Sequence, residues 1–421
     1  MDNIYDIRKE RQLQFIFSTE HTCFVPNNEK LGTVAVVVNL YYTEKVEYYS
    51  RYLNRMPEYI DLYIFSSKEE TLFEVKKVLH HRNTIYVRKK NRGRDLSAFL
   101  VSFRLYIDKY DIVCFVHDKK EHAPWLKADV DKWNENLWGN MIASSEYIYN
   151  VLQLFEEYPR MGMLFPPEPV GEIRTAWFKA SWYENFDNCL QLANKMGLTA
   201  DIREDKPPIA LGSVFWARRE VLSKLLEMNW KYTDFPEEPM PNDFTISHAI
   251  ERVLGYLAQD AGYDTGTIMT EKYASWLLSY LQDYVRLMFS EVSDRIGVDN
   301  FNQLRLLSVQ KEKLLDYIGL HSCFYLYGAG KQGITVLNLL REKGMEPAGF
   351  VVSDGNKRNE SIKGLKVYEL KDICTESVGI ILTVYYHFQE EMIRKLETYG
   401  IEDYFIVFDR TCGWDLVEFP S

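Results

Sequence analysis

GTVAVVVNLYY, residues 32–42, is an apolar run of about the length of one strand, and residues 34–38 contain no polar side chain. Such a run is typical of a strand that is buried on both faces of a sheet. Three further stretches have the same character: DLYIFSS (61–67), NTIYVRKK (83–90) and DIVCFVHDKK (111–120). Helices are expected between them, at about 44–57, 68–80 and 95–110. Strands that alternate with helices predict a mostly parallel sheet and an α/β fold.

Polar residues follow these strands where each one ends. They are Asn39, Ser66, residues 91–95 and residues 117–120. In open parallel sheets, ligands bind beyond the carboxyl ends of the strands. We therefore expect these polar groups to lie on one rim of the sheet and to form a binding site.

The chain of 421 residues is long enough for two or three domains. Residues 1–31 are expected to be an N-terminal extension of helix and loop, residues 32–270 a first α/β domain, and residues 321–421 a second. Residues 271–320 are expected to be a helical connector, because large apolar residues recur there at helical spacing. We expect these residues to pack against a core or another domain rather than a membrane surface: Trp276, Leu277, Tyr280, Leu281, Tyr284 and Leu287.

The composition excludes several classes of protein. The chain carries 50 Lys and Arg against 61 Asp and Glu, a net charge of −11, which argues against a nucleic-acid binder. The six cysteines are scattered and form no CxxC pair, as in a reduced cytoplasmic protein. The N-terminus is charged where a signal peptide needs an apolar core, and no apolar run approaches the roughly 18 residues of a membrane span. A cytoplasmic location is expected, and the sequence leaves the oligomeric state open.

The first candidate site is RKKNRGRD, residues 88–95, with five cations in the seven residues 88–94. Arginine presents a planar fork of donors that suits phosphate oxygens, and Gly93 allows close approach of the backbone. Asp95 stands where it could cap the following helix. This pattern favours binding of a nucleotide diphosphate, and the alternative is a solvated basic surface.

The second candidate site is HDKK, residues 117–120, at the end of an expected strand. Asp118 is placed to meet a divalent cation, because magnesium is commonly held by one or two carboxylates together with substrate phosphates. Lys119 or Lys120 could instead neutralise a leaving diphosphate. The alternative interpretation of this tetrapeptide is a simple turn.

The third candidate site is a group of ionisable residues before and at the start of an expected helix. Its members are Glu237, Glu238, Asp243, His248 and Glu251, and Asn242 or Asp243 could cap the helix. A carboxylate here could act as a general base toward a sugar hydroxyl. The alternative is that these residues are ordinary helix-surface groups.

Four segments in this order resemble the rhamnan synthesis protein F family of bacterial glycosyltransferases. They are NRGRDLSAFL (91–100), VHDKKEH (116–122), LGSVFWARREVL (211–222) and SHAIERVLGYLAQDAGY (247–263). The resemblance implies a GT-A-type fold over residues 32–270 and a nucleotide-sugar donor such as dTDP-rhamnose or a UDP-sugar. It also implies a glycan or lipid-linked acceptor in cell-surface polysaccharide synthesis, with peripheral contact at the inner face of the membrane.

The resemblance also implies roles for individual residues. The Asp-x-Asp that binds Mg²⁺ or Mn²⁺ in the GT-A plan corresponds here to His117-Asp118-Lys119, so Asp118 is the metal candidate. The general base of an inverting transferase corresponds to Asp243, with Glu237 and Glu238 as rivals. The donor-binding set is Asn39, Asn91, Gly93, Arg94, Asp95, His117, Asp118 and Lys119. Tryptophan and tyrosine side chains in 125–185 could stack on sugar faces, or belong to the core.

The second α/β domain contains a dinucleotide fingerprint. Gly328, Gly330 and Gly333 follow an expected strand and open an expected helix, and Asp354 ends the next strand, where a ribose-binding acid belongs. This loop could bind NAD or another nucleotide, or it could be a degenerate structural element. The fingerprint suggests one alternative to a glycosyltransferase, an NAD-dependent nucleotide-sugar oxidoreductase. The departure from Asp-x-Asp at residues 117–119 suggests another, a non-catalytic scaffold for polysaccharide assembly.

Overall fold

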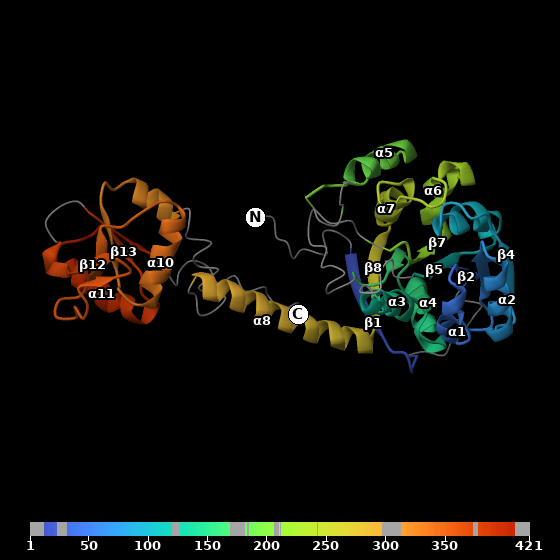
Figure 1. Ribbon diagram of the computed structural model, residues 1–421, viewed down its shortest axis with the longest axis horizontal. Helices are drawn as coiled ribbons and strands as arrows, with labels where there is room; N and C mark the ends of the chain where they lie inside the picture. Colours follow the sequence, from blue (N-terminus) through green and yellow to red (C-terminus); the bar gives the residue numbers. More distant parts are fainter. Residues whose placement is uncertain are drawn as a thin grey trace. The chain divides into compact units, whose positions relative to one another are not determined.

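The chain divides into two compact units, the N-terminal unit Met1–Leu278 and the C-terminal unit Ser279–Ser421. The structure is a computed structural model, shown in Figure 1. It describes residues 12–22, 32–119, 127–168, 182, 185–205, 210, 212–241, 243–296, 313–373 and 378–408. Lys120, Asn242 and most of the aromatic residues between 169 and 184 lie outside the described residues.

The N-terminal unit is built on an eight-stranded sheet of strand order β1-β8-β6-β7-β5-β2-β3-β4. Its strands are β1 Gln12–Phe17, β2 Val34–Asn39, β3 Asp61–Ser66, β4 Thr84–Arg88, β5 Ile112–His117, β6 Met161–Phe165, β7 Phe215–Arg218 and β8 Asp264–Thr270. Neighbouring strands are parallel except β7, which is antiparallel to both β5 and β6. The expected α/β class and the four expected strands β2–β5 are confirmed.

The helices of the N-terminal unit lie between these strands. They are α1 Val46–Leu53, α2 Glu69–Val78, α3 Lys127–Ile142, α4 Ser145–Glu157, α5 Phe186–Met196, α6 Ser223–Glu227 and α7 Ile246–Asp260. Short 3-10 turns are η1 Thr43–Lys45, η3 Phe103–Leu105, η4 Ile107–Lys109, η7 Arg219–Leu222 and η8 Tyr232–Asp234. The helix expected over 95–110 is instead a π-helical turn, η2 Ala98–Ser102, followed by η3 and η4. Such departures from α geometry often mark functional or strained segments.

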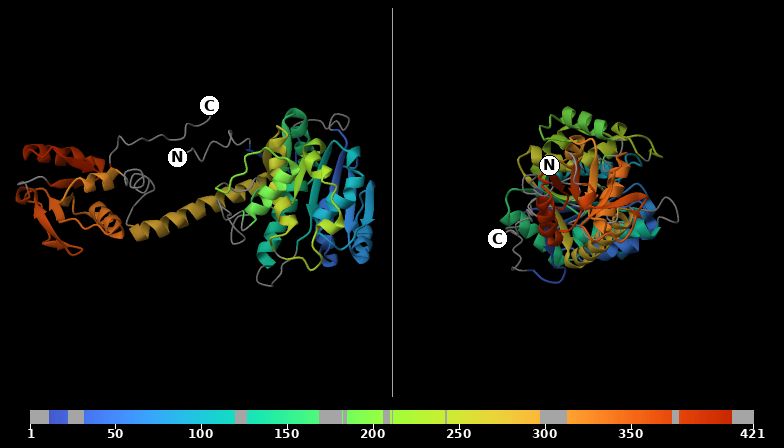
Figure 2. Two further views of the ribbon diagram at one scale, coloured as in Figure 1. Left: turned by 90° about the horizontal axis from the view of Figure 1, so that it is seen from above. Right: turned by 90° about the vertical axis from the view of Figure 1, so that its left-hand side faces the viewer.

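Both faces of the sheet are covered, which explains the unbroken apolar run in β2. Val34, Val36 and Val38 pack in one core together with residues of α1, α2, α3 and α4. Ala35 and Val37 point the other way, into a core shared with η2, α5 and α7. Alternate side chains of a strand point to opposite faces, so a strand between two helical layers needs apolar residues at every position. Figure 2 shows helices on both sides of this sheet.

The expectation of a helix and a loop for residues 1–31 was wrong for residues 12–17. This segment is strand β1, which pairs in parallel with β8, from Gln12 opposite Thr265 to Phe17 opposite Thr270. Leu13, Phe15 and Phe17 pack against the core, whereas Ile16 is 55% exposed. The alternation suits an edge strand with one buried face. Its partner β8 lies about 250 residues away in the sequence, so the residues around β1 gave no sign of the pairing.

The C-terminal unit contains a six-stranded sheet of order β11-β12-β10-β9-β13-β14. The strands are β9 Phe324–Tyr327, β10 Gly349–Val352, β11 Ser361–Ile362, β12 Leu365–Glu369, β13 Gly379–Leu382 and β14 Tyr404–Ile406. The long helices beside them are α10 Lys331–Glu342 and α11 Tyr386–Thr398, with a 3-10 turn at η9 Leu370–Asp372. Apart from β11, which is antiparallel to β12, the strands are parallel. The expected second α/β unit is confirmed.

Helix α8, Glu271–Ile296, confirms the helical expectation for the first half of 271–320. Its apolar side chains are less covered than expected, because Trp276 is 43% exposed and Leu287 is 63% exposed. Among the described residues, no helix is long and apolar enough to cross a membrane.

Candidate functional site

Three neighbouring parallel strands, β3, β2 and β5, end together, as expected for a binding rim. Asn39 at the end of β2 lies opposite His117 at the end of β5, so the two side chains share one face of the sheet. Asn39 is only 5% exposed, and its Oδ1 atom has no hydrogen-bond partner. A buried carbonyl oxygen without a donor costs roughly 1–3 kcal/mol. That cost marks Asn39 as a residue whose oxygen is available to a ligand donor.

Asp118 follows β5 and is held by the backbone of the segment after β2. Its Oδ2 atom accepts hydrogen bonds from the backbone N–H groups of Tyr41 at 2.8 Å and Tyr42 at 2.7 Å. Burial raises the pKa of Asp118 to about 6, even though the two N–H groups act in the opposite direction. The side chain is therefore an ionised, buried carboxylate at neutral pH. The sequence placed Asp118 at this rim but gave no sign of its two backbone donors.

His117 joins three separate segments of the N-terminal unit. Its Nε2 atom lies 3.0 Å from Asp95 Oδ2 and 2.8 Å from the Gly212 carbonyl oxygen, and its Nδ1 atom lies 3.2 Å from the Asp118 carbonyl oxygen. A carboxylate and two carbonyl groups can only accept hydrogen bonds. Through these contacts, His117 joins the Asp95 side chain and the Gly212 backbone to the end of β5.

Asp95 does not cap a helix, as the sequence had suggested. Asp95 directly precedes the helical residues 96–102, but its carboxylate points to His117. Burial acts to raise the pKa of Asp95, but the charges of His117 and Lys119 outweigh it and the net shift is downward. A carboxylate paired in this way ties the 91–95 loop to the end of β5.

Most cations of the 88–94 cluster are engaged with other protein groups. Arg88 pairs with Glu69 at 3.0 Å, and Arg92 donates to the Phe235 carbonyl oxygen and pairs with Glu237 at 3.2 Å. Lys90 lies 5.7 Å from the centre of the Tyr232 ring. The solvated-surface interpretation therefore holds for part of this cluster.

Lys89 is the buried member of the same cluster. Its Nζ atom donates to the Lys90 carbonyl oxygen and to Ser97 Oγ, each at 3.0 Å. Burial lowers the pKa of Lys89 to about 8. Its charge holds the shape of the loop that presents Arg94 and Asp95.

Gly93 has a packing role in this loop. Its φ is +72°, and a Cβ atom there would lie 2.6 Å from Phe235 Cγ and 2.9 Å from Ser97 Cβ. Asn91, at the exposed tip, accepts a hydrogen bond from Ser67 Oγ at 3.2 Å. The close approach that requires glycine at position 93 is therefore made by Phe235.

Arg94 and Lys119 are the two cations that face the rim. Arg94 donates to the Met240 carbonyl oxygen at 3.1 Å and adopts a φ of +42°. Burial and Asp118 raise the pKa of Tyr42 while Arg94 lowers it, so the Arg94 charge reaches the strand ends. Lys119 Nζ lies 4.1 Å from the centre of the Trp133 ring. Within the described residues, neither cation has a carboxylate at ion-pair distance.

Asp243 is held in a defined orientation. Its Oδ1 atom accepts hydrogen bonds from Asn185 Nδ2 at 2.7 Å and from the Phe244 backbone N–H at 2.9 Å. No donor among the described residues contacts Oδ2, and the side chain is 34% exposed. One oxygen is thus fixed by the protein while the other remains open to a substrate hydroxyl. Asn185 was missed by the sequence reasoning, because nothing near it in the sequence resembles a site.

The two rival carboxylates have other partners. Glu237 is an exposed partner of Arg92, and Glu238 Oε2 accepts a hydrogen bond from the Met240 backbone N–H at 3.1 Å. Neither shows the arrangement of one fixed and one open oxygen that Asp243 has. The geometry therefore favours Asp243 among the three.

Helix α7 begins next to Asp243 and is capped by Thr245 rather than by Asp243. His248 Nδ1 lies 2.8 Å from Thr245 Oγ1 and 3.9 Å from Asp243 Oδ1. Burial lowers the pKa of His248, and Arg94 adds to this effect while Glu251 and Asp243 oppose it. The Arg94 charge thus acts on His248 as well as on Tyr42, which connects the strand ends with the Asp243 loop.

Comparison with known proteins agrees with this part of the chain. A family model described as rhamnan synthesis protein F matches residues 1–263. The chain belongs to this family. Two curated relatives, each named "Uncharacterized protein WxcX" and found in two strains of Xanthomonas campestris pv. campestris, are 28% identical over 183 residues. The match covers 42% of this chain and 24% of each relative, so the chain spans about a quarter of the relatives' length.

The family name associates this part of the chain with rhamnan synthesis. The matched residues include the strand ends, the 88–94 cluster and Asp243. The glycine loop of the C-terminal unit lies beyond them, so its role must be argued from its own geometry.

The glycines of this second loop have distinct structural roles. Gly328 has a φ of +122°, and a Cβ atom on Gly333 would lie only 2.0 Å from the Gly328 carbonyl oxygen. No atom would contact a Cβ on Gly330 within 4 Å, at the start of α10. A tight turn, an open position and a close helix-strand contact are the three roles that the dinucleotide fingerprint requires.

Asp354, the expected ribose-binding acid, already has two protein partners. Its Oδ1 accepts from the Lys371 backbone N–H at 3.0 Å, and its Oδ2 accepts from the Tyr399 hydroxyl. The Tyr399 and Lys371 hydrogen bonds lower the pKa of Asp354. The three glycines are packed as the fingerprint requires, whereas the acid expected at the ribose end is hydrogen-bonded within its own unit.

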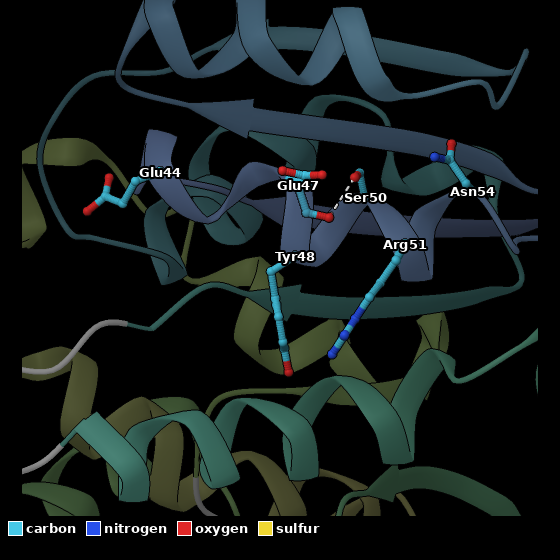
Figure 3. A pocket seen from close by; sticks show the side chains of 6 residues that line it. All are labelled: Glu44, Glu47, Tyr48, Ser50, Arg51 and Asn54. Atoms are coloured by element: carbon cyan, nitrogen blue, oxygen red, sulfur yellow. Dashed lines mark hydrogen bonds between the residues drawn. The ribbon is translucent and has the colours of Figure 1, made fainter.

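A shallow depression of about 630 Å³ lies elsewhere, along α1 (Figure 3). Its lining residues are Glu44, Glu47, Tyr48, Ser50, Arg51 and Asn54. The Arg51 guanidinium stacks over the Tyr48 ring at 4.0 Å, so the main cation at this place is already paired with an aromatic face. None of the six belongs to the strand-end rim, and we assign the depression no part in the chemistry.

Proposed function

We propose that the N-terminal unit is an inverting glycosyltransferase of GT-A type that takes its sugar from a nucleotide-diphosphate donor. Family membership and the position of the polar rim at the carboxyl ends of β3, β2 and β5 support this proposal. The antiparallel strand β7, set into a parallel sheet beside β5, also supports it. The observation that carries the proposal is Asp243, with one oxygen fixed by Asn185 and the other open.

In this proposal each group has a defined task. Asn39 Oδ1 accepts a hydrogen bond from the donor nucleotide, and the 91–95 loop with His117, Asp118 and Lys119 surrounds its diphosphate. Asp243 Oδ2 takes the proton from an acceptor hydroxyl as its oxygen attacks the anomeric carbon. The bond from that carbon to the diphosphate oxygen breaks on the opposite face. A positioned general base contributes roughly 10²- to 10⁴-fold to such a rate.

The acceptor in this proposal is a glycan or a lipid-linked glycan, and the donor is dTDP-rhamnose or a UDP-sugar. Peripheral contact with the inner face of the membrane would bring the site to a lipid-linked acceptor. The family name, rhamnan synthesis protein F, supports the rhamnose donor and the glycan acceptor among these partners.

The test is sugar transfer by the purified full chain from a panel of dTDP-, UDP- and GDP-sugars, with products detected by mass spectrometry. Asp243→Asn should lower the rate by roughly 10²- to 10⁴-fold. Asp108→Asn, at a side chain that is 88% exposed, is the matched control and should leave the rate unchanged. Absence of transfer from every donor, or full activity of Asp243→Asn, would overturn the proposal and favour a scaffold.

The oxidoreductase alternative rests on the glycine loop of the C-terminal unit. The spacing and packing of its glycines resemble the fingerprint, but the carboxylate of Asp354 is engaged by Tyr399 and Lys371. Nicotinamide binding by the C-terminal unit therefore stays a prediction, and we do not propose a hydride transfer.

A further inference from the structure

The residues at the end of β5 fit a divalent cation poorly. Both ring nitrogens of His117 already contact protein acceptors, so neither is available as a metal ligand. Asp118 uses Oδ2 to accept two backbone N–H groups. Among the described residues, no group of three or more His, Cys, Asp or Glu side chains could hold a metal ion. A metal here would have to rely on one oxygen of a buried carboxylate.

The positive side chains around Asp118 disfavour binding of a divalent cation. The strand-end cluster, defined as Lys89, Arg94, Asp95, His117, Asp118 and Lys119, contains two carboxylates. The charges of Lys119 and His117 act to lower the pKa of Asp95, and His117 opposes the upward shift that burial gives the pKa of Asp118. Counting only the lysines, the arginine and the carboxylates, three positive groups stand against two negative ones. A divalent cation would be repelled by this excess, whereas a diphosphate would be attracted.

Lys119 and Arg94 are the members of this cluster best placed to meet an anion. The Lys119 ammonium lies over the face of Trp133, an interaction that leaves its three N–H donors free of any carboxylate within the described residues. Arg94 uses one N–H of its fork on the Met240 carbonyl and acts electrostatically on Tyr42 and His248. By contrast, Lys89 and Arg92 donate hydrogen bonds to protein groups that hold the 91–95 loop in place.

We propose that Lys119 and Arg94 bind the diphosphate of the donor and balance its charge as it leaves, without a resident divalent cation. This inference rests on the proposed function, and it adds how the leaving group is stabilised. The bond from the anomeric carbon to the diphosphate oxygen breaks, the acceptor oxygen bonds to that carbon, and Asp243 keeps the proton. The nucleoside diphosphate departs with one more negative charge, next to the two cations.

Calorimetric binding of dTDP and UDP to the full chain tests this inference, in EDTA and again with Mg²⁺ or Mn²⁺. We expect dissociation constants in the two conditions to agree within about threefold. Because a hydrogen bond to a charged group contributes about 1.5–3 kcal/mol, Lys119→Ala and Arg94→Ala should each weaken binding by roughly tenfold or more. Lys119→Arg, which keeps the charge, should bind within a few-fold of the unmodified chain.

Arg88→Gln is the matched control, because Arg88 belongs to the same basic loop but pairs with Glu69. It should leave the affinity unchanged, and thermal unfolding checks that every variant is folded. Calorimetric binding of inorganic pyrophosphate, measured separately, distinguishes a site for any diphosphate from one that also contacts the nucleoside.

The outcomes separate the two proposals. Binding that disappears in EDTA and returns with Mg²⁺ or Mn²⁺ overturns this inference and leaves the transferase intact. Metal-independent binding without sugar transfer supports this diphosphate site and overturns the transferase. If neither nucleoside diphosphates nor pyrophosphate bind under any condition, both proposals fail.

Discussion

The two units end their parallel strands in very different ways. In the N-terminal unit, the rim is assembled from segments far apart in the sequence. Burial raises the pKa of Asp118 and lowers that of Lys89, and the pKa of Asp95 is lowered by neighbouring charges. In the C-terminal unit, one short glycine loop forms the rim, and its acid Asp354 is exposed and bound to Tyr399 and Lys371. Shifted pKa values cluster where chemistry is done. The pKa of Asp354 is also shifted, but by hydrogen bonds at an exposed position, so the difference in burial favours the first rim as the place of the proposed chemistry.

The largest expected effect concerns packing in the C-terminal unit. In Gly333→Ala the new Cβ atom would meet the Gly328 carbonyl oxygen at 2.0 Å, whereas in Gly330→Ala it would meet no atom within 4 Å. We expect the first substitution to destabilise this unit by about 3 kcal/mol and the second to change little. Thermal unfolding measures both. Loss of sugar transfer in Gly330→Ala, with its stability unchanged, would break the comparison by giving the second rim a part in the chemistry.

The next effect concerns the pH dependence of stability and Asp118. Its folded-state pKa of about 6 lies above the ordinary value of 3.8, so the folded chain binds this proton more tightly than the unfolded chain. Its contribution to stability therefore falls as the pH rises from about 4 to about 6. The free energy of unfolding of Asp118→Asn, relative to that of the unmodified chain, should therefore rise by about 2 kcal/mol over this pH range.

Denaturant unfolding at several pH values gives this difference directly. Asp108→Asn, whose side chain is 88% exposed, serves as the control and should show no such trend. If the stability of Asp118→Asn and that of the unmodified chain depended on pH in the same way, burial at this rim would not raise the pKa of Asp118.

A smaller effect is expected from Asn185. It is fully buried, does not cap α5 although it precedes that helix, and leaves its own Oδ1 without a partner. It stabilises the ionised form of Asp243 through a 2.7 Å hydrogen bond. Asn185→Ala should therefore slow sugar transfer roughly tenfold, because a hydrogen bond to a charged group contributes about 1.5 kcal/mol or more.

The control is Asn136→Ala, since Asn136 is also buried and donates to the Pro167 carbonyl oxygen at 2.8 Å. A comparable loss of stability without a comparable loss of sugar transfer is expected there. If Asn185→Ala slows transfer no more than Asn136→Ala does, Asn185 only packs, and Asp243 loses its main structural support as the base.

The smallest effect is expected at Tyr399. Tyr399→Phe removes a hydrogen bond that lowers the pKa of Asp354, so that pKa should rise. The depressed pKa of Asp354 stabilises the folded state at pH values above the ordinary pKa of 3.8. In Tyr399→Phe the free energy of unfolding near neutral pH should therefore fall slightly. The loss should be less than about 1 kcal/mol, because the site is exposed. Carboxyl NMR titration follows Asp354. Tighter nucleotide binding by Tyr399→Phe would show that the acid is a blocked ligand group rather than a structural one.

Several elements could be predicted because their signal is local. The apolar runs of β2, β3 and β5 and the glycine loop before α10 carry their own pattern, and the structure confirms them. Strand β1 could not be recognised, since its identity depends on pairing with β8. The antiparallel direction of β7 likewise depends on its neighbours β5 and β6.

The candidate site divides in the same manner. His117, Asp118 and Lys119 follow a recognisable strand, so their position at the rim was predictable. The partners of the five cations in 88–94 were not, because Glu69, Phe235 and Glu237 come from other segments. Asn185 lies 58 residues before Asp243, and neither residue type nor spacing links them.

The sequence by itself determined the α/β class, the two units and the kinds of charged groups that reach the first rim. Only the tertiary structure decided which cations of the first rim lack a carboxylate partner among the described residues, which of the three candidate carboxylates has one fixed and one open oxygen, and which atoms of His117 and Asp118 are engaged by protein groups. The physical reason is that hydrophobic periodicity is a local property of the chain. Hydrogen-bond partners and desolvation are set by whichever distant segments the fold brings together.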